Sequence, residues 1–262
     1  MAEKKRELAV VVSQERLAEG IFSMWLQTEA ARSALPGQFI SMYTNDSSKL
    51  LPRPISICEI DRENMRLRVV YRVTGENTGT EQFSRMKAGD TLPMIGPLGN
   101  GFPLEAGKGK RAFLMGGGIG VPPILELAKE LECEAKQIVV GYRDAQTFLR
   151  EEFEQNGRLY ISTEDGSVGT SGNVMDAIRE NALEADIIYA CGPMPMLRAI
   201  KQYAMEHGIE ACYISLEERM ACGIGACLGC VCKTKKKDHH SNVNNARICK
   251  DGPVFLASEV EI

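Results

Sequence analysis

Short hydrophobic stretches separated by turn-forming residues run through the first hundred residues of the chain. The stretches lie at residues 8–12, 21–26, 39–43, 55–60 and 67–73. Glycine, proline, asparagine and aspartate stand between them, as at Pro36-Gly37 and Asn45-Asp46. Several short strands at this spacing predict an antiparallel barrel or sandwich. Residues 96–101 contain too much glycine for regular structure, and we expect them to form a loop.

The pattern changes near residues 102–110, where hydrophobic strands begin to alternate with helical segments. The predicted strands are residues 112–115, 137–141, 159–162 and 186–190. One predicted helix begins at Pro122, and three more cover residues 145–154, 174–181 and 194–206. This alternation predicts βαβ units and a parallel sheet. After residues 209–216 no regular period is visible, and residues 222–249 are rich in glycine, cysteine and lysine.

We therefore predict an α+β multidomain chain of three parts. Residues 1–105 form an antiparallel β-barrel domain, residues 106–214 an α/β parallel-sheet domain, and residues 215–262 a small module held together by its ligands.

Composition and charge narrow the functional classes. The chain has 262 residues, of which 44% are hydrophobic and 25% charged, which is typical of a globular protein with a substantial core. The formal net charge of -4 argues against nucleic acid as the main partner, because phosphate binding favours a basic face. No secretory signal or membrane-spanning run is visible, so we expect a cytoplasmic protein whose thiols stay reduced.

Cysteine usage points to a metal centre. The chain has nine cysteines, an odd number, and they concentrate near its C-terminal end rather than spreading as a disulfide framework would. Cys222, Cys227 and Cys230 have the spacing C-x4-C-x2-C, which is the plant-type 2Fe–2S pattern, and Cys249 can supply the fourth thiolate. The glycines between them allow the loop to fold inward and bring backbone N–H groups close to sulfur.

The alternative is a zinc site on the same four thiolates. Zinc sites usually show paired C-x2-C knuckles, whereas here only Cys227 and Cys230 have that spacing. We do not expect Cys232 to be a ligand, because its spacing does not fit the motif. We expect the side chains of three further cysteines to be buried like small apolar residues: Cys58, Cys133 and Cys212.

Two glycine-containing turns predict a dinucleotide site. Residues 116–123, with the sequence Gly-Gly-Gly-Ile-Gly-Val-Pro-Pro, lie between a predicted strand and a predicted helix, where the pyrophosphate of a dinucleotide binds. The turn departs from G-x-G-x-x-G, and its alternative is a plain strand–helix connection. Cys191-Gly192-Pro193 ends a later strand, at the edge where open α/β sheets bind ligands, so the two turns together favour a nicotinamide cofactor.

A third candidate is Arg53-Pro54-Ile55-Ser56, on a predicted barrel strand. We expect Arg53 and Ser56 to face the same side of the strand and to hydrogen-bond one phosphate. The alternative is an ordinary solvated arginine.

These motifs together resemble the ferredoxin–NADP reductase superfamily, in which a flavin-binding barrel precedes a nucleotide domain. The whole chain resembles, in order, the electron-transfer subunit of class 1B dihydroorotate dehydrogenase. The segments that carry the resemblance are Arg53–Ser56, Val70–Arg72, Gly79-Thr80, Gly116–Pro123, Cys191–Pro193, Met220–Cys227 and Cys249–Phe255.

The resemblance implies a role for each motif. The FAD site would comprise Arg53, Pro54, Ile55, Ser56, Val70, Tyr71, Arg72, Gly79 and Thr80. The NAD site would comprise Gly117, Gly118, Gly120, Cys191, Gly192 and Pro193. The 2Fe–2S cluster would be ligated by Cys222, Cys227, Cys230 and Cys249. No residue is assigned to catalysis on dihydroorotate, since no orotate site is visible.

The resemblance also implies a function and a partner. Electrons would pass from dihydroorotate to FMN in a catalytic subunit, then through the cluster and FAD of this chain to NAD, in pyrimidine biosynthesis. Two chains of each kind would form a heterotetramer. The first alternative is the flavin subunit of another NAD(P)H-linked ferredoxin reductase or a sulfhydrogenase, and the second is a zinc-holding interaction module without enzymatic activity. We expect the lysine-rich residues 233–240 to form a solvated loop, although they could instead dock an acidic partner.

Overall fold

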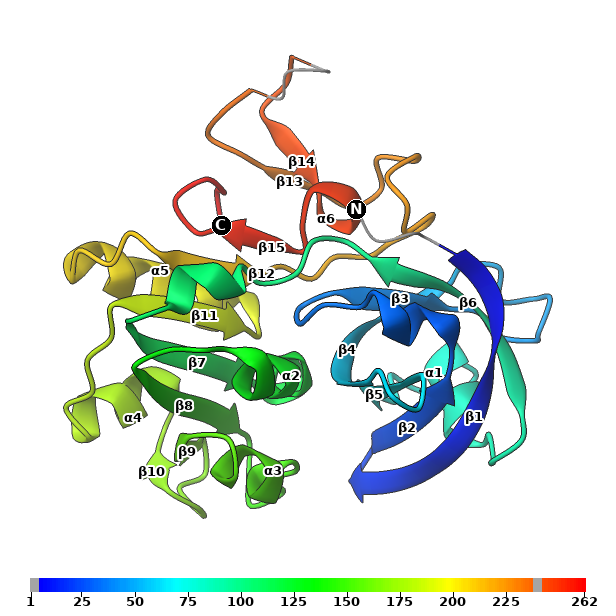
Figure 1. Ribbon diagram of the computed structural model, residues 1–262, viewed down its shortest axis with the longest axis horizontal. Helices are drawn as coiled ribbons and strands as arrows, with labels where there is room; N and C mark the ends of the chain where they lie inside the picture. The colour runs from blue at the N-terminus through cyan, green and yellow to red at the C-terminus, as the bar shows by residue number, and fades with distance from the viewer. Residues whose placement is uncertain (1–4, 238–241) are drawn as a thin grey trace. The chain divides into compact units, whose positions relative to one another are not determined.

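The structure, a computed structural model, describes residues 5–237 and 242–262, which form two compact units (Figure 1). The first unit contains the described residues up to 101 together with residues 217–231 and 247–253. The second contains residues 102–216, 232–246 and 254–262. The C-terminal region therefore contributes segments to both units, while the three-part division at residues 105 and 214 stays a prediction.

The first unit is built on a closed antiparallel barrel, as the strand pattern predicts. Its strands, in the order in which they pair, are β1 (Lys5–Ala18), β2 (Ile21–Gln27), β5 (Arg66–Arg72), β4 (Arg53–Asp61), β3 (Phe39–Met42) and β6 (Thr91–Leu98). Strand β6 was not expected, and it extends into the glycine-rich stretch that was predicted to be a loop. Gly96 suits this strand because a Cβ there would lie 2.6 Å from the side chain of Ile40.

Side chains that alternate along the strands fill the barrel. On β3, Ile40 and Met42 belong to this core, so Phe39 and Ser41 lie on the outer face of the strand. Helix α1 (Gly79–Ser84) contributes Phe83, whose ring packs edge-on against Tyr71. Three short turns of 3-10 helix among the described residues cover Glu29–Arg32, Leu104–Gly107 and Gly118–Gly120.

The second unit is an α/β layer structure around a seven-stranded sheet. Its strands, in order across the sheet, are β10 (Thr170–Ser171), β9 (Arg158–Thr163), β8 (Ala135–Tyr142), β7 (Arg111–Gly117), β11 (Ile187–Cys191), β12 (Cys212–Ser215) and β15 (Val254–Leu256). All neighbours are parallel except β12 and β15, which are antiparallel. The central strands β7 and β11 are buried along almost their whole length, as strands covered on both faces should be.

Helices lie on both faces of this sheet. α2 (Pro122–Glu130) and α3 (Arg150–Glu154) lie on one face, and α4 (Val174–Glu180) and α5 (Met194–Glu206) lie on the other (Figure 1). The helix expected over residues 145–154 begins only at Arg150. Leu149 has a left-handed φ of 65°, and the side chain of Asp144 accepts a hydrogen bond from the backbone of Gln146, so the preceding residues form turns.

The C-terminal region has little regular structure. It contains α6 (Ile248–Asp251) and a two-stranded sheet of β13 (Val231–Lys233) and β14 (Asn245–Arg247). Part of the predicted lysine-rich loop, residues 238–240 with both of its histidines, lies outside the described residues.

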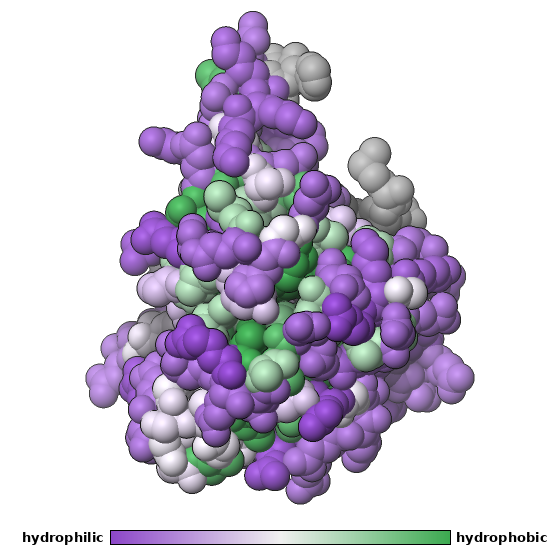
Figure 2. All heavy atoms as spheres, turned by 90° about the vertical axis from the view of Figure 1, so that its left-hand side faces the viewer, coloured by the Kyte–Doolittle hydropathy of each residue, from purple (hydrophilic) through white to green (hydrophobic). Residues whose placement is uncertain are grey.

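Hydrophilic residues cover most of the face shown in Figure 2, with hydrophobic residues in patches between them. In the described part of the chain, no helix combines the length and the hydrophobicity needed to cross a membrane.

Candidate cofactor-binding sites

The two predicted nucleotide turns lie side by side in the second unit. Strands β7 and β11 are parallel neighbours, with Gly116 paired to Cys191, so the turns that follow them leave the same edge of the sheet. A Cβ at Gly120 would lie 2.5 Å from the carbonyl oxygen of Cys191 and 2.6 Å from the amide nitrogen of Gly192. The backbones of the two turns therefore touch at a point where only glycine fits.

Met196 completes this contact, and sequence reasoning missed it. A Cβ at Gly117 would lie 2.4 Å from the sulfur of Met196, and one at Gly192 would lie 2.8 Å from the same atom. Met196 lies in the first turn of α5, so its side chain closes over both glycines. Its position three residues after Pro193 gives no sequence signal that distinguishes it from any helix methionine.

The chemistry available at these turns comes from the backbone. The Cys191 side chain is fully buried, so only the main chain of this residue could contact a ligand. Helix α2 starts with Pro122 and Pro123, which have no N–H groups, so donors for an anion must come from the glycine turn before them. Gly118 has a left-handed φ of 56°, which orients this turn away from the strand.

The predicted flavin strand is β4 of the barrel. The guanidinium group of Arg53 lies directly over Gly79, where a Cβ would be 2.7 Å from Nε, and its Nη1 also donates to the carbonyl of Leu51. Gly79 is the first residue of α1, which is capped by the Thr78 side chain. Thr80 is buried, and its hydroxyl accepts a hydrogen bond from the Thr74 amide at 3.1 Å. The first unit thus brings an arginine together with the Gly79-Thr80 turn.

The expectation that Arg53 and Ser56 face the same side of the strand is wrong. They are three positions apart, and side chains alternate with a period of two. In the register, Arg53 pairs with Met42, whose side chain is in the barrel core, whereas Ser56 pairs with Phe39 on the outer face. The two side chains therefore leave opposite faces of β4 and do not converge on one group.

The segment Val70–Arg72 is divided between core and surface. Tyr71 is fully buried in the barrel, where its hydroxyl donates to Gln14 at 2.7 Å and burial raises its pKa. Its side chain is therefore structural, and only its backbone is available to a cofactor. Arg72 is exposed.

The four predicted ligand cysteines all belong to the first unit. Residues 222–230 form an irregular loop, in which Gly223, Gly225 and Leu228 have left-handed φ values of 69°, 88° and 57°. This backbone turns the amides of the loop toward its own sulfurs, and the Ala226 N–H donates to Cys222 Sγ at 3.3 Å. The expectation that glycines supply positive φ values in this loop is confirmed for Gly223 and Gly225 but is wrong for Gly229, whose φ is not left-handed.

The cysteines approach one another in two pairs. Cys222 and Cys227 interact through their side chains, and the Cys249 amide donates to Cys230 Sγ at 3.4 Å. Burial would raise the pKa of Cys222, but hydrogen bonds from Ile224, Cys227 and Ala226 outweigh it and lower the pKa to about 6. Burial and the neighbouring Cys230 raise the pKa of Cys249 to about 12.

This donor set fits a two-iron cluster. A 2Fe–2S cluster takes four thiolates, two on each iron, and the structure offers two pairs of thiols. Loop amides directed at sulfur are the hydrogen-bond donors that such clusters use. Within residues 5–237 and 242–262, no three His, Cys, Asp or Glu side chains surround one point closely enough to hold a single metal ion.

The remaining cysteines differ from one another. Cys58 and Cys212 are buried, as predicted, whereas Cys133 is only half-buried and that expectation was wrong. Cys232 lies on β13 and is half-buried, and its exclusion from the ligand set stays a prediction.

The loop of residues 222–230, called the cluster loop below, presents an apolar surface. Cys227 is exposed, and three hydrophobic residues close to it in the chain are also exposed: Ile224 at 44%, Leu228 at 62% and Val231 at 40%. The segment that carries Cys249 is anchored to the residues that follow β6, because the Asn100 amide donates to the Gly252 carbonyl at 2.6 Å.

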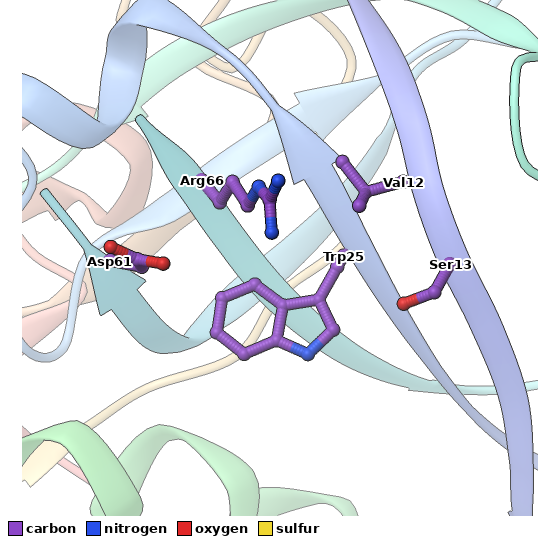
Figure 3. Close-up of a pocket in the computed structure, with 5 residues that line it drawn as sticks. All are labelled: Val12, Ser13, Trp25, Asp61 and Arg66. Carbon is purple, nitrogen blue, oxygen red and sulfur yellow. The ribbon is translucent and has the colours of Figure 1, made fainter. Parts of the chain in front are cut away.

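A separate pocket on the barrel contains none of the predicted site residues. Val12, Ser13, Trp25, Asp61 and Arg66 line it, and Figure 3 shows the Arg66 side chain directed toward the Trp25 ring. Asp61 accepts hydrogen bonds from Asn64, which lower its pKa.

Comparison with known proteins identifies the family. The electron transfer subunit of dihydroorotate dehydrogenase B (NAD(+)) from Geobacillus sp. strain WCH70 is 43% identical over 98% of both chains. The subunit of the same name from Fusobacterium nucleatum is 43% identical over 98% of this chain and 99% of its own. The chain belongs to the family of dihydroorotate dehydrogenase B electron transfer subunits. Residues 217–261 also match the iron-sulfur cluster binding domain of dihydroorotate dehydrogenase B.

Solved structures support the fold. The structure of an NADH-dependent reduced ferredoxin-NADP oxidoreductase matches with a TM-score of 0.85 and 29% identity, over 97% of this chain and 90% of the other. A ferredoxin NADP+ reductase from Neisseria gonorrhoeae matches with a TM-score of 0.66 at 15% identity, over 82% of this chain and 94% of the other, and shows the fold alone.

Family membership confirms several predictions. The resemblance, the fold class of barrel, parallel-sheet domain and C-terminal iron–sulfur region, and the assignment as an NAD-linked oxidoreductase subunit in electron transfer are correct. The predicted cofactor set of FAD, a 2Fe–2S cluster and NAD agrees with this family, so the zinc-module alternative is not supported. The roles of individual residues stay predictions.

Proposed function

We propose that the chain is the subunit that connects the FMN of a dihydroorotate-oxidising partner to NAD, by way of a 2Fe–2S cluster and FAD, in pyrimidine biosynthesis. The observation that carries the proposal is the pairing of Cys222 with Cys227 and of Cys230 with Cys249 in a chain of this family. Iron–sulfur clusters exchange single electrons and nicotinamides accept hydride, and a bound flavin can take part in both kinds of transfer.

The chain's own task in this function is to hold and orient the three groups. Cys222, Cys227, Cys230 and Cys249 are the proposed cluster ligands. The low pKa of Cys222 supports this role, because the thiolate is the form that binds metal. The amides of the loop stay directed at sulfur after binding and stabilise its negative charge.

Two parts of the barrel are proposed to hold FAD. Arg53 and the Gly79-Thr80 turn would bind the phosphates, since the guanidinium already lies over Gly79. Ser56 leaves the opposite face of β4, so we assign it, with Pro54 and Ile55, to another part of the cofactor. In Val70–Arg72, the Tyr71 backbone and the exposed Arg72 side chain would complete the site.

The adjoining turns of the second unit are proposed to hold NAD. Gly117, Gly118 and Gly120 would offer backbone donors to the pyrophosphate, and Cys191, Gly192 and Pro193 would form the opposite wall. The close backbone contact between the turns supports this assignment, because it brings main-chain groups of both turns together.

The partner is proposed to dock on the exposed cluster loop. Ile224, Leu228 and Val231 give this loop an apolar surface next to Cys227, which suits a protein interface better than solvent. We propose a heterotetramer of two electron-transfer and two catalytic subunits, with neither nucleic acid nor membrane as a partner. Nine cysteines, four of them proposed as cluster ligands, support a location in the reducing cytoplasm.

A second candidate has support from one observation. The structure of the NADH-dependent reduced ferredoxin-NADP oxidoreductase matches almost the whole chain at 29% identity. The chain could therefore serve as a flavin and cluster subunit of such a reductase. The higher identity of 43% to dihydroorotate dehydrogenase B subunits favours the first function.

The test separates the cluster from the flavin. In Cys227→Ser, we expect iron and sulfide to be lost while FAD content and NADH-dependent dye reduction persist, because the proposed FAD and NAD residues lie elsewhere. Dihydroorotate-dependent NAD reduction by the complex with the catalytic subunit should fall to background.

The matched control is Cys232→Ser, which removes a neighbouring thiol outside the motif and should retain the cluster. A Cys227→Ser protein with full iron content and normal electron flow to NAD would refute the ligand assignment. NADH-dependent reduction of a ferredoxin by the chain, without any dihydroorotate-dependent NAD reduction when the catalytic subunit is added, would favour the second candidate.

A further inference from the structure

The outer face of strand β3 carries a buried hydroxyl. Ile40 and Met42 point into the barrel, so Ser41 between them points outward. An outward side chain on a barrel would normally meet water, yet Ser41 is 0% exposed. Something in the first unit must therefore cover it.

The cluster loop provides this cover. A Cβ at Gly223 would lie 2.6 Å from Ser41 Oγ and 3.6 Å from a methyl group of Leu98, so the loop backbone rests directly on β3 and β6. Gly223 is adjacent to Cys222 in the chain. The Ser41 hydroxyl is thus in contact with the residue next to a proposed cluster ligand.

The Ser41 hydroxyl also lacks a hydrogen-bond partner. Its Oγ is one of two fully buried side-chain oxygens without a partner among the described residues, the other being Ser162 Oγ. Buried hydroxyls are almost always hydrogen-bonded in native proteins, because leaving one unsatisfied is unfavourable. An acceptor is therefore missing on the side that faces the cluster loop.

We propose that Ser41 is a positioning residue for the 2Fe–2S cluster, and that its hydroxyl donates a hydrogen bond to a sulfur of the bound cluster. Thiolate and sulfide sulfurs carry negative charge and accept hydrogen bonds without donating any. This inference rests on the proposed function, since it takes Cys222 as a ligand. It adds a residue from the barrel, 181 positions before Cys222 in the chain, that no cysteine motif indicates.

A donor to cluster sulfur has a defined electronic consequence. One-electron reduction makes the cluster more negative, so a hydrogen bond to its sulfur stabilises the reduced form more than the oxidised form. Ser41 therefore raises the reduction potential of the cluster. No proton is transferred in this step, and the hydroxyl acts only through its dipole.

The experiment compares Ser41→Ala with the unchanged full-length chain, both loaded with FAD and cluster. The readout is the midpoint potential of the cluster, obtained by redox titration followed by electron paramagnetic resonance of the reduced state. We expect the substitution to lower the potential, by about 59 mV if the preference for the reduced form falls tenfold. The resonance line shape should shift at the same time.

Ser162→Ala is the matched control. Ser162 lies on β9 in the second unit, is equally buried and also lacks a partner, so this variant loses the same kind of hydroxyl away from the cluster loop. Its cluster potential should stay unchanged.

Two results would overturn the inference. One is a Ser41→Ala protein with full iron content and an unaltered potential. The other is a Ser41→Ala protein that keeps its FAD but cannot hold iron, which would assign the hydroxyl to loop assembly. Failure of the proposed function is a separate outcome, because the unchanged chain would then contain no 2Fe–2S cluster to titrate.

Discussion

Gly120 offers a direct test of the nucleotide site, because its neighbours are backbone atoms that cannot rotate away. We consider Gly120→Ala, the smallest possible addition. The new Cβ would lie 2.5 Å from the Cys191 oxygen, 2.6 Å from the Cys191 carbonyl carbon and 2.6 Å from the Gly192 nitrogen. Two of these atoms belong to Cys191, the last residue of β11, and the third belongs to Gly192, which follows it.

The size of the effect follows from these distances. Ordinary contact begins at 3.4 Å, so the two turns must separate by about 0.9 Å, the difference from the shortest contact. Overpacking of this kind typically costs about 1–3 kcal/mol. For a chain of this size, a loss of about 2 kcal/mol corresponds to a fall in melting temperature of roughly 4–8 °C.

The effect on NADH should be larger than the effect on stability. A displacement of about 1 Å at a binding site can reduce a rate by roughly a hundredfold. We therefore expect kcat/KM for NADH, measured with a dye as electron acceptor, to fall by at least roughly tenfold. FAD and iron content should be unchanged, since Gly120 belongs to the second unit and the proposed ligands of both groups belong to the first.

Gly109→Ala is the control in the same unit. Gly109 has a φ of 66° but nothing within 4 Å of its would-be Cβ, so this variant suffers backbone strain of about 1–2 kcal/mol without moving the turns. Its melting temperature should fall while its kcat/KM for NADH stays normal. If Gly120→Ala had a normal kcat/KM, or if Gly109→Ala lost as much, the proposed NAD site would be wrong.

Two further variants test the barrel. Arg53→Gln removes the guanidinium next to Gly79, and we expect FAD to bind roughly tenfold to a hundredfold more weakly by fluorescence titration, since hydrogen bonds to charged groups contribute about 1.5–3 kcal/mol. Arg85→Gln, on the exposed side of the same helix region, should bind FAD normally, and equal losses in both would argue against a specific phosphate contact. Glu59→Ala breaks the buried ion pair in which Arg68 Nη1 lies 2.5 Å from Glu59 Oε2, and should lower the unfolding free energy in urea by about 3 kcal/mol. Glu15→Ala, which removes the exposed partner of the same arginine, should have little effect, and a Glu59→Ala protein as stable as the original would contradict the assignment.

Hydrophobic periodicity predicted most strands of both sheets, but not β10 and β15 of the second unit. The barrel strands and the alternating strands and helices repeat their hydrophobic residues with periods of two and 3.6, and burial enforces both periods. Strand β6 was missed because Pro93, Gly96 and Pro97 interrupt its pattern. In the structure, β6 is stabilised by its neighbours, because it pairs with both β1 and β3 and so closes the barrel.

The candidate sites were predictable only where the chemistry is encoded locally. The cysteine spacing and the glycine turns are properties of short segments, so a single sequence reveals them. Met196 and Ser41 were not predictable, because each becomes relevant through a contact made by a distant part of the chain. The error over Arg53 and Ser56 had a simpler cause: strand alternation separates residues three positions apart.

Strand β3 connects the two proposed cofactor sites of the first unit. Its edge pairs with β4, which carries the Arg53–Ser56 motif, and its outer face carries Ser41 against the cluster loop. Its inner face holds Ile40 and Met42 in the core, so the strand cannot shift without disturbing the barrel. The separation between the proposed FAD strand and the cluster loop is therefore fixed by a hydrogen-bonded, closed sheet. Since electron transfer depends on cofactor placement, a substitution that loosens β3 should impair transfer between cluster and FAD before it affects NADH binding, which belongs to the other unit.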